Sequence, residues 1–399
     1  MKSIILKFFG RFKKQPVLKK VRRYQFLLKE VPKQEFRISF SCLKSGYFSD
    51  SFEATGKLSK SMDANSISII NVFTNQPAKV VDFFIYKREI QLIVKDLSCI
   101  KPRFNNTTIF KIVYKTEGQK PIILASFALF LLQSRPQTIF IVGSPRSGTT
   151  AVGKAVQKIL NKTVHGESHI APYFKRLQAI AIRERGKSSA VKSKGTLMHE
   201  LLPIELELEF HNMVKNIHTS FYGREFIIDK TPGLPMIEAL PFLFRIYPNS
   251  KVIFCKRRGI ENIQSRLRKF PKVSFRTHCR QWVNSMKGWT KIKKQLVSQT
   301  GHESWLCEID QYELLHDSIN EINKIASFLN TDKTQAKKAI NFLKKNSPQR
   351  TSKDTSATSL EKTDWTDEQK IYFLSKSSAV MKAFNYSFDD QYFLKDKEQ

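Results

Sequence analysis

Residues 138–160 combine a short apolar run, a loop rich in Gly, Ser and Pro, and a helical stretch. The run TIFIV at 138–142 has the continuous apolar character of a strand buried on both faces. It leads into the loop GSPRSG at 143–148 and a helical stretch at 149–160. Glycine lets the backbone turn sharply, and the first free N–H groups of a helix form an anion site with the positive end of its dipole. The segment therefore predicts a phosphate-binding loop, to which Thr149 and Thr150 add hydroxyl donors.

Two further strand-like runs follow the loop. Residues 225–228 lead into the sequence DKTP at 229–232, and residues 251–255 precede another helix. Strand–loop–helix units in series form parallel sheets with helices on both faces. The sequence therefore predicts an α/β fold with a P-loop-like parallel sheet flanked by helices.

The chain before this region has a different pattern. Runs rich in β-branched and aromatic residues, separated by Gly, Asn, Pro and Asp, lie between about residue 36 and residue 115. The predicted strands are 37–41, 66–73, 80–86, 90–94 and 108–114. They predict a β-rich accessory domain at residues 36–135, without a catalytic constellation of its own. The predicted organisation is a basic N-terminal segment at 1–35, this domain, and a catalytic domain at 136–399.

The loop departs from the nucleotide triphosphatase motif. Walker A requires Lys directly after the last glycine, whereas Thr149 follows Gly148 here and the cationic side chain lies earlier, at Arg146. No paired acidic motif for a magnesium ion is apparent, which disfavours ATP or GTP hydrolysis. A P-loop kinase of a small molecule remains the alternative enzyme class.

A second anion contact is predicted after the strand at 251–255. Arg257 lies at the end of this strand, and Ser265 lies eight residues later on the following helix. Two helical turns separate them, so a guanidinium and a hydroxyl can converge on one phosphate. The alternative interpretation is a solvated basic helix face, because this stretch is strongly basic.

These motifs resemble the sulfotransferase superfamily, whose sulfate donor is 3′-phosphoadenosine 5′-phosphosulfate (PAPS). The sequence PRSGTT at 145–150 is similar to the family loop that holds the 5′-phosphosulfate. The resemblance extends over residues 138–388 and implies a sulfuryl transfer to an acceptor hydroxyl that leaves 3′,5′-adenosine bisphosphate. It also implies donor contacts from a set of residues along this region. They are Arg146, Ser147, Gly148, Thr149, Thr150, Arg257 and Ser265, with Arg258 as the alternative to Arg257, and Arg350 and Lys353 in a basic loop near the C-terminus.

Sulfuryl transfer needs a base for the acceptor proton and cations for the charge that grows on the leaving oxygen. Arg146 in the loop and Lys230 in the DKTP turn are the predicted cations. Residues 166–172 (GESHIAP) resemble a stretch of tyrosylprotein sulfotransferases, and the resemblance implies that Glu167 is the base. His169 stands where that family has Arg, and His165 is the second candidate for the base.

The charge of the chain predicts an anionic partner. It holds 68 Lys and Arg against 35 Asp and Glu, a formal net charge of +33. A polyanion-binding protein is therefore the non-enzymatic alternative, although no helix-turn-helix, zinc-finger or RNA-binding aromatic motif predicts a specific nucleic acid. The compatible acceptors are a polysaccharide, a glycolipid or a protein tyrosine, and among them the charge favours an acidic polysaccharide or an acidic peptide.

The remaining composition concerns compartment and membrane contact. Five scattered cysteines without CxxC spacing disfavour a disulfide scaffold, a zinc module or another metal centre, and indicate a reducing, cytoplasmic compartment. Residues 1–37 hold twelve Lys and Arg, and apolar residues recur at helical spacing in 1–14. This pattern predicts either a helix lying on the inner face of a membrane or a helix packed on its own protein.

Overall fold

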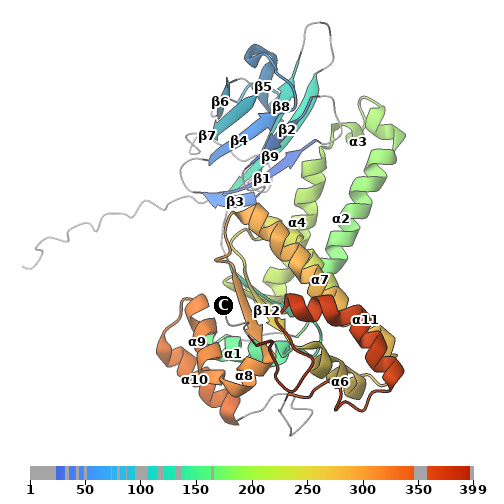
Figure 1. Ribbon diagram of the computed structural model, residues 1–399. Coiled ribbons are helices and arrows are strands. Elements are labelled where there is room, and N and C mark those ends of the chain that lie inside the picture. The colour runs from blue at the N-terminus through green and yellow to red at the C-terminus, as the bar shows by residue number, and fades with distance from the viewer. Residues whose placement is uncertain are drawn as a thin grey trace, which may run out of the picture.

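The computed structural model of the 399-residue chain describes residues 24–31, 36–41, 45–48, 52–72, 74–78, 81–86, 88–94, 107–115, 118, 121–131, 136–162, 166–345 and 357–395. The amphipathic stretch at 1–14 lies outside these residues. Figure 1 shows a β-rich upper part and a lower part in which helices surround a sheet, with the helices α2 and α4 rising beside the upper part. None of the described helices combines the length and the apolar character that crossing a bilayer requires.

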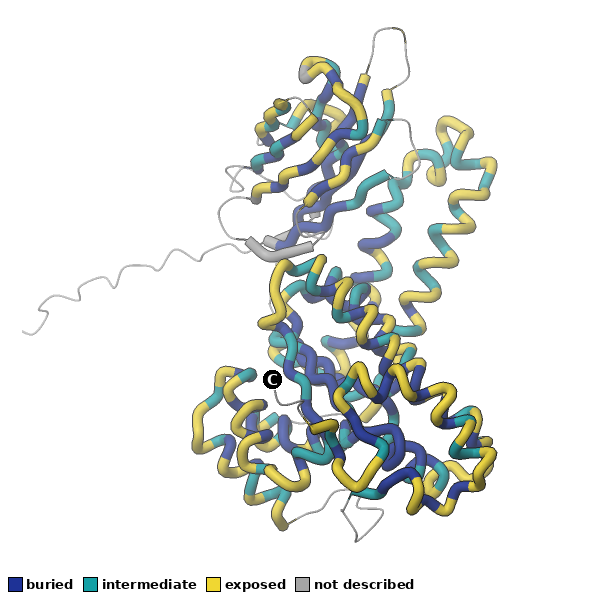
Figure 2. Tube along the Cα trace, in the orientation of Figure 1, coloured by how far each residue is buried: buried dark blue, intermediate teal, exposed yellow. Residues whose placement is uncertain are grey.

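The upper part is a sandwich of two antiparallel sheets. The larger sheet has the order β3-β1-β9-β8-β5, with β1 (Tyr24–Glu30), β3 (Ser45–Phe48), β5 (Ile67–Asn71), β8 (Thr107–Tyr114) and β9 (Ile122–Leu131). The smaller sheet has the order β2-β4-β7-β6, with β2 (Ile38–Phe40), β4 (Phe52–Leu58), β6 (Val81–Tyr86) and β7 (Glu89–Val94). Alternate residues of both sheets face a shared core. In Figure 2 the buried residues accordingly line the space between the sheets.

Strand β1 changes the predicted organisation. Its residues belong to the segment 1–35, which the sequence sets apart as a basic N-terminal piece, yet they form the second strand of the larger sheet. The described part of the β-sandwich therefore begins at Tyr24. The strand lies in a strongly basic stretch, so charge alone does not indicate that Phe26 and Leu28 are buried in the core.

The lower part is built on a parallel sheet, as the sequence predicts. Its order is β11-β10-β12-β13, with β10 (Gln137–Gly143), β11 (Phe226–Lys230), β12 (Lys251–Lys256) and β13 (Leu306–Asp310). All residues of β10 from Thr138 to Gly143 are buried, which confirms the predicted two-faced burial of this strand.

The described helices of the chain have the following bounds. They are α1 (Thr149–Leu160), α2 (Ile170–Lys187), α3 (Leu197–Glu200), α4 (Pro203–Tyr222), α5 (Leu234–Ile246), α6 (Gly259–Lys269), α7 (Phe275–Thr300), α8 (Gln311–His316), α9 (Ser318–Phe328), α10 (Lys333–Lys345) and α11 (Asp367–Ala383). Short 3₁₀ turns lie at Ala64–Ser66 and Ser189–Lys192.

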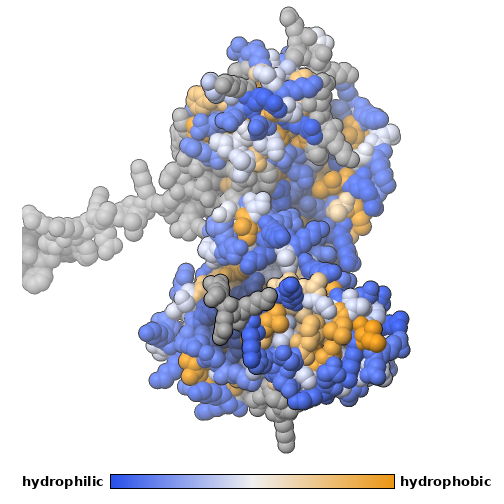
Figure 3. Space-filling model, in the orientation of Figure 1, coloured by the Kyte–Doolittle hydropathy of each residue, from blue (hydrophilic) through white to orange (hydrophobic). Residues whose placement is uncertain are grey.

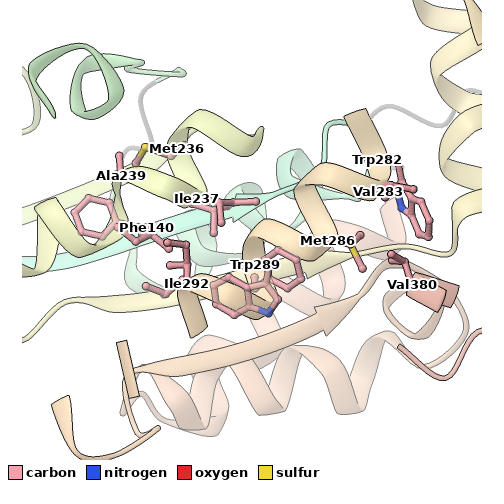
Figure 4. Packing of buried hydrophobic residues seen from close by; sticks show 14 of the residues in the cluster. Phe140, Met236, Ile237, Ala239, Trp282, Val283, Met286, Trp289, Ile292 and Val380 are labelled. Carbon is pink, nitrogen blue, oxygen red and sulfur yellow. The ribbon is translucent and has the colours of Figure 1, made fainter. Parts of the chain in front are cut away.

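The helices cover both faces of the parallel sheet. Ile139 and Ile141 of β10 pack with side chains of α1, α9 and α10 on one face. Phe140 and Val142 point to the other face, toward α5, α7 and α11. Figure 4 shows Phe140 of that face together with Met236 and Ile237 of α5, Trp289 and Ile292 of α7 and Val380 of α11. Alternate side chains of this one strand thus contribute to the apolar clusters on both faces of the sheet.

The sandwich is joined to the lower part through α4. Leu27 of β1 and Ala128 of β9 form a small apolar cluster with Ile204 and Leu208 of this helix. Glu207 of α4 is buried beside the cluster, accepts a hydrogen bond from Lys29 of β1 at 2.9 Å and pairs with Arg245 of α5. Burial raises the pKa of Glu207, but the charges of Arg245 and Lys29 outweigh it and lower the pKa to about 2. The accessory sandwich is thus fixed to the helices of the lower part by both apolar packing and a buried ion cluster.

Candidate active site

The loop between β10 and α1 has the backbone that a phosphate loop requires. A Cβ atom on Gly143 would lie 2.2 Å from the carbonyl oxygen of Cys255 on the neighbouring strand, so only glycine fits there. Gly148 has φ 84° and is the N-cap residue of α1. Arg146 has φ 72°, a left-handed conformation that costs a residue with a side chain about 1 kcal/mol or more. The free N–H groups at the start of α1 therefore lie at a strained, tightly turned loop.

Helix α6 holds this loop from the side. The Asn262 amide donates to the carbonyl oxygen of Pro145 and to Ser147 Oγ, both at 3.0 Å. Arg266 donates through Nη2 to Ser144 Oγ at 2.9 Å and through Nε to Asn262 Oδ1 at 2.8 Å. Burial lowers the pKa of Arg266 to about 10. The loop is therefore fixed by two buried polar residues of α6.

Asn262 and Arg266 are not among the site residues that the sequence predicts. A signal is present in the sequence, because they lie four residues apart and share one helix face with Ser265, but a polar helix face does not by itself show which loop it contacts. Of the predicted loop residues, Ser147 and Thr149 are buried, whereas Thr150 is half-buried. Ser147 Oγ is already a hydrogen-bond acceptor within the protein.

Arg257 and Ser265 both form hydrogen bonds with Arg146 of the loop. The Arg257 Nη1 donates to the backbone oxygen of Arg146 at 3.2 Å, and Arg146 Nε donates to Ser265 Oγ at 3.1 Å. Burial lowers the pKa of Arg257, and burial together with the nearby charge of Arg268 lowers the pKa of Arg146. Among the described residues, the buried Nε of Arg257 has no hydrogen-bond partner. The two guanidinium groups thus form a cationic site that an anion would stabilise.

The neighbouring Arg258 makes different contacts. Its side chain is fully buried and donates to both carboxylate oxygens of Glu261. It also lies 4.9 Å from the ring centroid of Tyr392 and donates to backbone oxygens of the C-terminal region, those of Thr358, Ser387, Asp389 and Gln391. With its donors used in this way, Arg258 ties the C-terminal segment to α6, and Arg257 is the arginine that faces the loop.

The predicted base and cation are in direct contact. Lys230, the last residue of β11, donates through Nζ to Glu167 Oε1 at 3.0 Å. The second oxygen of Glu167 lies 3.2 Å from Nε2 of His169. The Lys230 side chain lies next to Gly153 of α1, because a Cβ added to Gly153 would lie 3.4 Å from Lys230 Cγ. The sheet order places β11 beside β10, so this pair stands next to the helix that begins at the loop.

A buried hydrogen-bond network lies behind this pair. Ser168 Oγ donates to Asp229 Oδ2 at 2.5 Å, and its backbone N–H donates to Thr231 Oγ1 at 3.0 Å. Thr231 in turn donates to Asp229 Oδ1 at 2.7 Å. Burial raises the pKa of Asp229, and burial together with the charge of Asp229 raises the pKa of Tyr222. The network joins the residue after Glu167 to the residues on both sides of Lys230.

Three predicted site residues lie outside the described part of the chain. They are His165, Arg350 and Lys353. The structure therefore brings together Arg146, Arg257 and Ser265 at the loop, and Glu167 with Lys230 beside α1. In the described residues, no group of three or more His, Cys, Asp and Glu side chains could hold a metal ion.

The chain is similar to known proteins in sequence family and in structure. No curated protein matches the sequence. The structure is similar to sulfotransferase STF9 from Mycobacterium avium, with 11% identity, 65% of this chain and 79% of that chain covered, and a TM-score of 0.40. It is also similar to the sulfotransferase domain from the curacin biosynthetic pathway, with 18% identity, 62% and 99% of the two chains covered, and a TM-score of 0.37. The family model described as "Sulfotransferase family" matches residues 136–335, half of the chain. The chain therefore belongs to the sulfotransferase family.

Proposed function

We propose that the chain transfers a sulfuryl group from PAPS to a hydroxyl group of an acceptor. The observation that carries this proposal is the contact between Lys230 and Glu167 beside α1, whose N-terminus forms the loop contacted by Arg257. A carboxylate that can act as a general base and a cation thus lie next to a loop with the backbone features of a phosphate site.

The loop residues fit a donor that carries two phosphate groups. The N–H groups at the start of α1 and the side chain of Arg146 would hold the 5′-phosphosulfate. Arg257 and Ser265, which both contact Arg146, would hold the 3′-phosphate. The buried Nε of Arg257, which has no partner among the described residues, supports this assignment, because an anion would satisfy it. When bound, PAPS supplies the sulfuryl group and a phosphate leaving group.

Glu167 accepts the acceptor's hydroxyl proton as the bond between the acceptor oxygen and sulfur forms and the bond between sulfur and the phosphate oxygen breaks. Arg146 and Lys230 stabilise the negative charge that grows on that phosphate oxygen. Lys230 and His169 orient the Glu167 carboxylate through its two oxygens. The remaining lone pairs of these two oxygens can accept the hydrogen bond of an acceptor hydroxyl.

Calorimetry and a transfer assay test the proposal together. The protein is titrated with 3′,5′-adenosine bisphosphate, and separately with ATP and Mg²⁺. Transfer of radiolabelled sulfate from PAPS is then measured on a panel of hydroxyl acceptors. We expect bisphosphate binding without added metal and transfer to at least one acceptor. Binding of ATP and Mg²⁺ without binding of the bisphosphate would instead indicate a kinase and overturn the proposal.

A further inference from the structure

The outer surface of α1 and α10 carries closely spaced lysines. Lys154 and Lys158 lie one turn apart on α1 and are exposed. The Nζ of Lys158 lies 5.0 Å from the ring centroid of Phe342 on α10. Lys338 and Lys345 lie four residues before and three residues after Phe342, so they share its side of α10 and are exposed as well. We call these four lysines the lysine strip.

The charge of the lysine strip is not compensated locally. The sequences of α1 and α10 contain no Asp or Glu. Among the described residues, none of the four lysines has a carboxylate oxygen within 4.0 Å, and Lys154 only approaches the Gln157 side chain, at 3.5 Å. Figure 3 shows predominantly hydrophilic side chains over α9 and α10, at the lower left of the molecule. The uncompensated positive charge of these lysines attracts an anionic partner.

The lysine strip begins at the candidate active site. Thr150 of the phosphate loop lies one turn before Lys154 on α1, and Gly153 contacts Lys230. Because a helix rises about 1.5 Å per residue, Lys158 lies about 12 Å along α1 from Thr150. An extended anionic molecule bound on the strip would therefore reach the start of α1, where the phosphate loop lies.

The surface also indicates the kind of anion. No large apolar side chain of α1 or α10 is among the exposed ones in the described chain. A membrane-binding helix needs such side chains to insert, and a groove that binds an amphipathic peptide helix needs apolar pockets. Acidic peptide motifs are typically bound by arginine clusters, whereas the four residues of the strip are lysines. A row of ammonium groups over two packed helices instead matches the repeated carboxylate or sulfate groups of a linear polymer.

We propose that the lysine strip binds an acidic polysaccharide and presents it as the acceptor, which rests on the proposed sulfuryl transfer. The test measures binding of fluorescein-labelled hyaluronan, an unsulfated uronic-acid polymer, in the absence of PAPS. The K158E/K338E variant reverses two charges of the strip. The matched control, K287E/K291E, reverses two exposed lysines one turn apart on α7.

We expect K158E/K338E to weaken hyaluronan binding by about tenfold or more, and K287E/K291E by less than about twofold. The milder variant K158Q/K338Q should weaken binding in the same direction, and all variants should still bind 3′,5′-adenosine bisphosphate as the wild type does. Equal losses in the two charge-reversal variants, or no binding by the wild type, would overturn the proposal. Tighter, strip-dependent binding of phosphatidylserine vesicles or of polyglutamate would overturn the choice of polysaccharide. Intact hyaluronan binding without sulfate transfer to any acceptor would count against the proposed reaction and not against the strip.

Discussion

The hydroxyl of Ser168 donates a 2.5 Å hydrogen bond to the buried carboxylate of Asp229. Ser168 directly follows Glu167, and Asp229 directly precedes Lys230. The bond therefore fixes the two backbone segments that carry the proposed base and the proposed cation, and we infer that Asp229 positions the contact between them.

Replacing Asp229 with Asn should lower kcat by about 10- to 100-fold, because a small misplacement of Glu167 relative to Lys230 costs about that much. Binding of 3′,5′-adenosine bisphosphate should not change, since Arg257 and the loop lie elsewhere. Ser168→Ala should have a similar effect, and the double variant should lose no more than the larger single loss. Additive losses in steady-state kinetics would show that the two residues act independently.

Replacing Glu167 with Gln should reduce kcat by about 10²- to 10⁴-fold, the usual contribution of a general base. Calorimetry should give the same affinity for 3′,5′-adenosine bisphosphate as in the wild type. Glu184→Gln is the control, because Glu184 lies on α2 and is exposed, paired with Arg183 and Lys187. Full turnover in Glu167→Gln would reject this residue as the base and make His165 the next candidate.

The two adjacent arginines should respond in opposite ways to substitution. Arg257→Ala should weaken bisphosphate binding by about 100-fold or more, because it removes a buried charge-assisted contact, while thermal stability changes little. Arg258→Ala should lower the free energy of unfolding by about 3–5 kcal/mol, because it leaves Glu261 and several carbonyl oxygens of the C-terminal segment without their donor. Calorimetric titration and denaturant unfolding of both variants separate these outcomes, and a swap of the two effects would reverse the assignment.

Glu207 should be essential for joining the sandwich to the helices. Glu207→Gln should lower the free energy of unfolding by about 3–5 kcal/mol, because Lys29 and Arg245 lose the carboxylate that both contact. Glu209→Gln, two residues away and exposed, should change stability by less than about 0.5 kcal/mol. Urea unfolding followed by fluorescence checks both variants. Because the pKa of Glu207 is lowered to about 2, its contribution is complete above its ordinary value of 4.5 and is lost as the pH falls toward 2.

Asp310 should produce the opposite pH dependence. It is buried and accepts hydrogen bonds from the hydroxyl of Tyr386 at 2.6 Å and from the backbone N–H of Tyr312 at 2.9 Å. Burial raises its pKa from 3.8 to about 6, so the folded state favours the neutral carboxyl group. The stability of the wild type relative to Asp310→Asn should therefore fall by about 3 kcal/mol as the pH rises from about 3 to about 7, through the unfolded and folded pKa values of Asp310. Denaturant titrations of both proteins across this range check the prediction, and a constant difference would contradict it.

Much of the fold could be predicted because the signals are local. The apolar run of β10, the glycines of the loop and the periodicity of α1 all lie within 24 residues, and the structure confirms each of them. The apolar β6, β7 and β8 were likewise predicted near their observed bounds. By contrast, β1, β3 and β4 were not predicted, since their short apolar patterns are interrupted by Lys, Gly and Ser.

The sequence predicts many of the site residues but not which of them contact one another. The sequence placed Arg257 and Ser265 on one phosphate but could not choose between Arg257 and Arg258, because adjacent residues have the same local signal. It also gave no reason to select Asp229, whose partner Ser168 is 61 residues away. Asn262, which holds the loop from a distance of 115 residues along the chain, was missed for the same reason.

By itself, the sequence determined the strand–loop–helix unit and the chemical types gathered around it, because backbone turns and helix starts depend on neighbouring residues. Only the tertiary structure decided which arginine faces the loop, that Lys230 contacts Glu167, and that Glu207 joins the sandwich to α4 and α5. Those choices depend on which elements pack together and on which polar groups become buried, and a buried charge must find its partner wherever the fold places it.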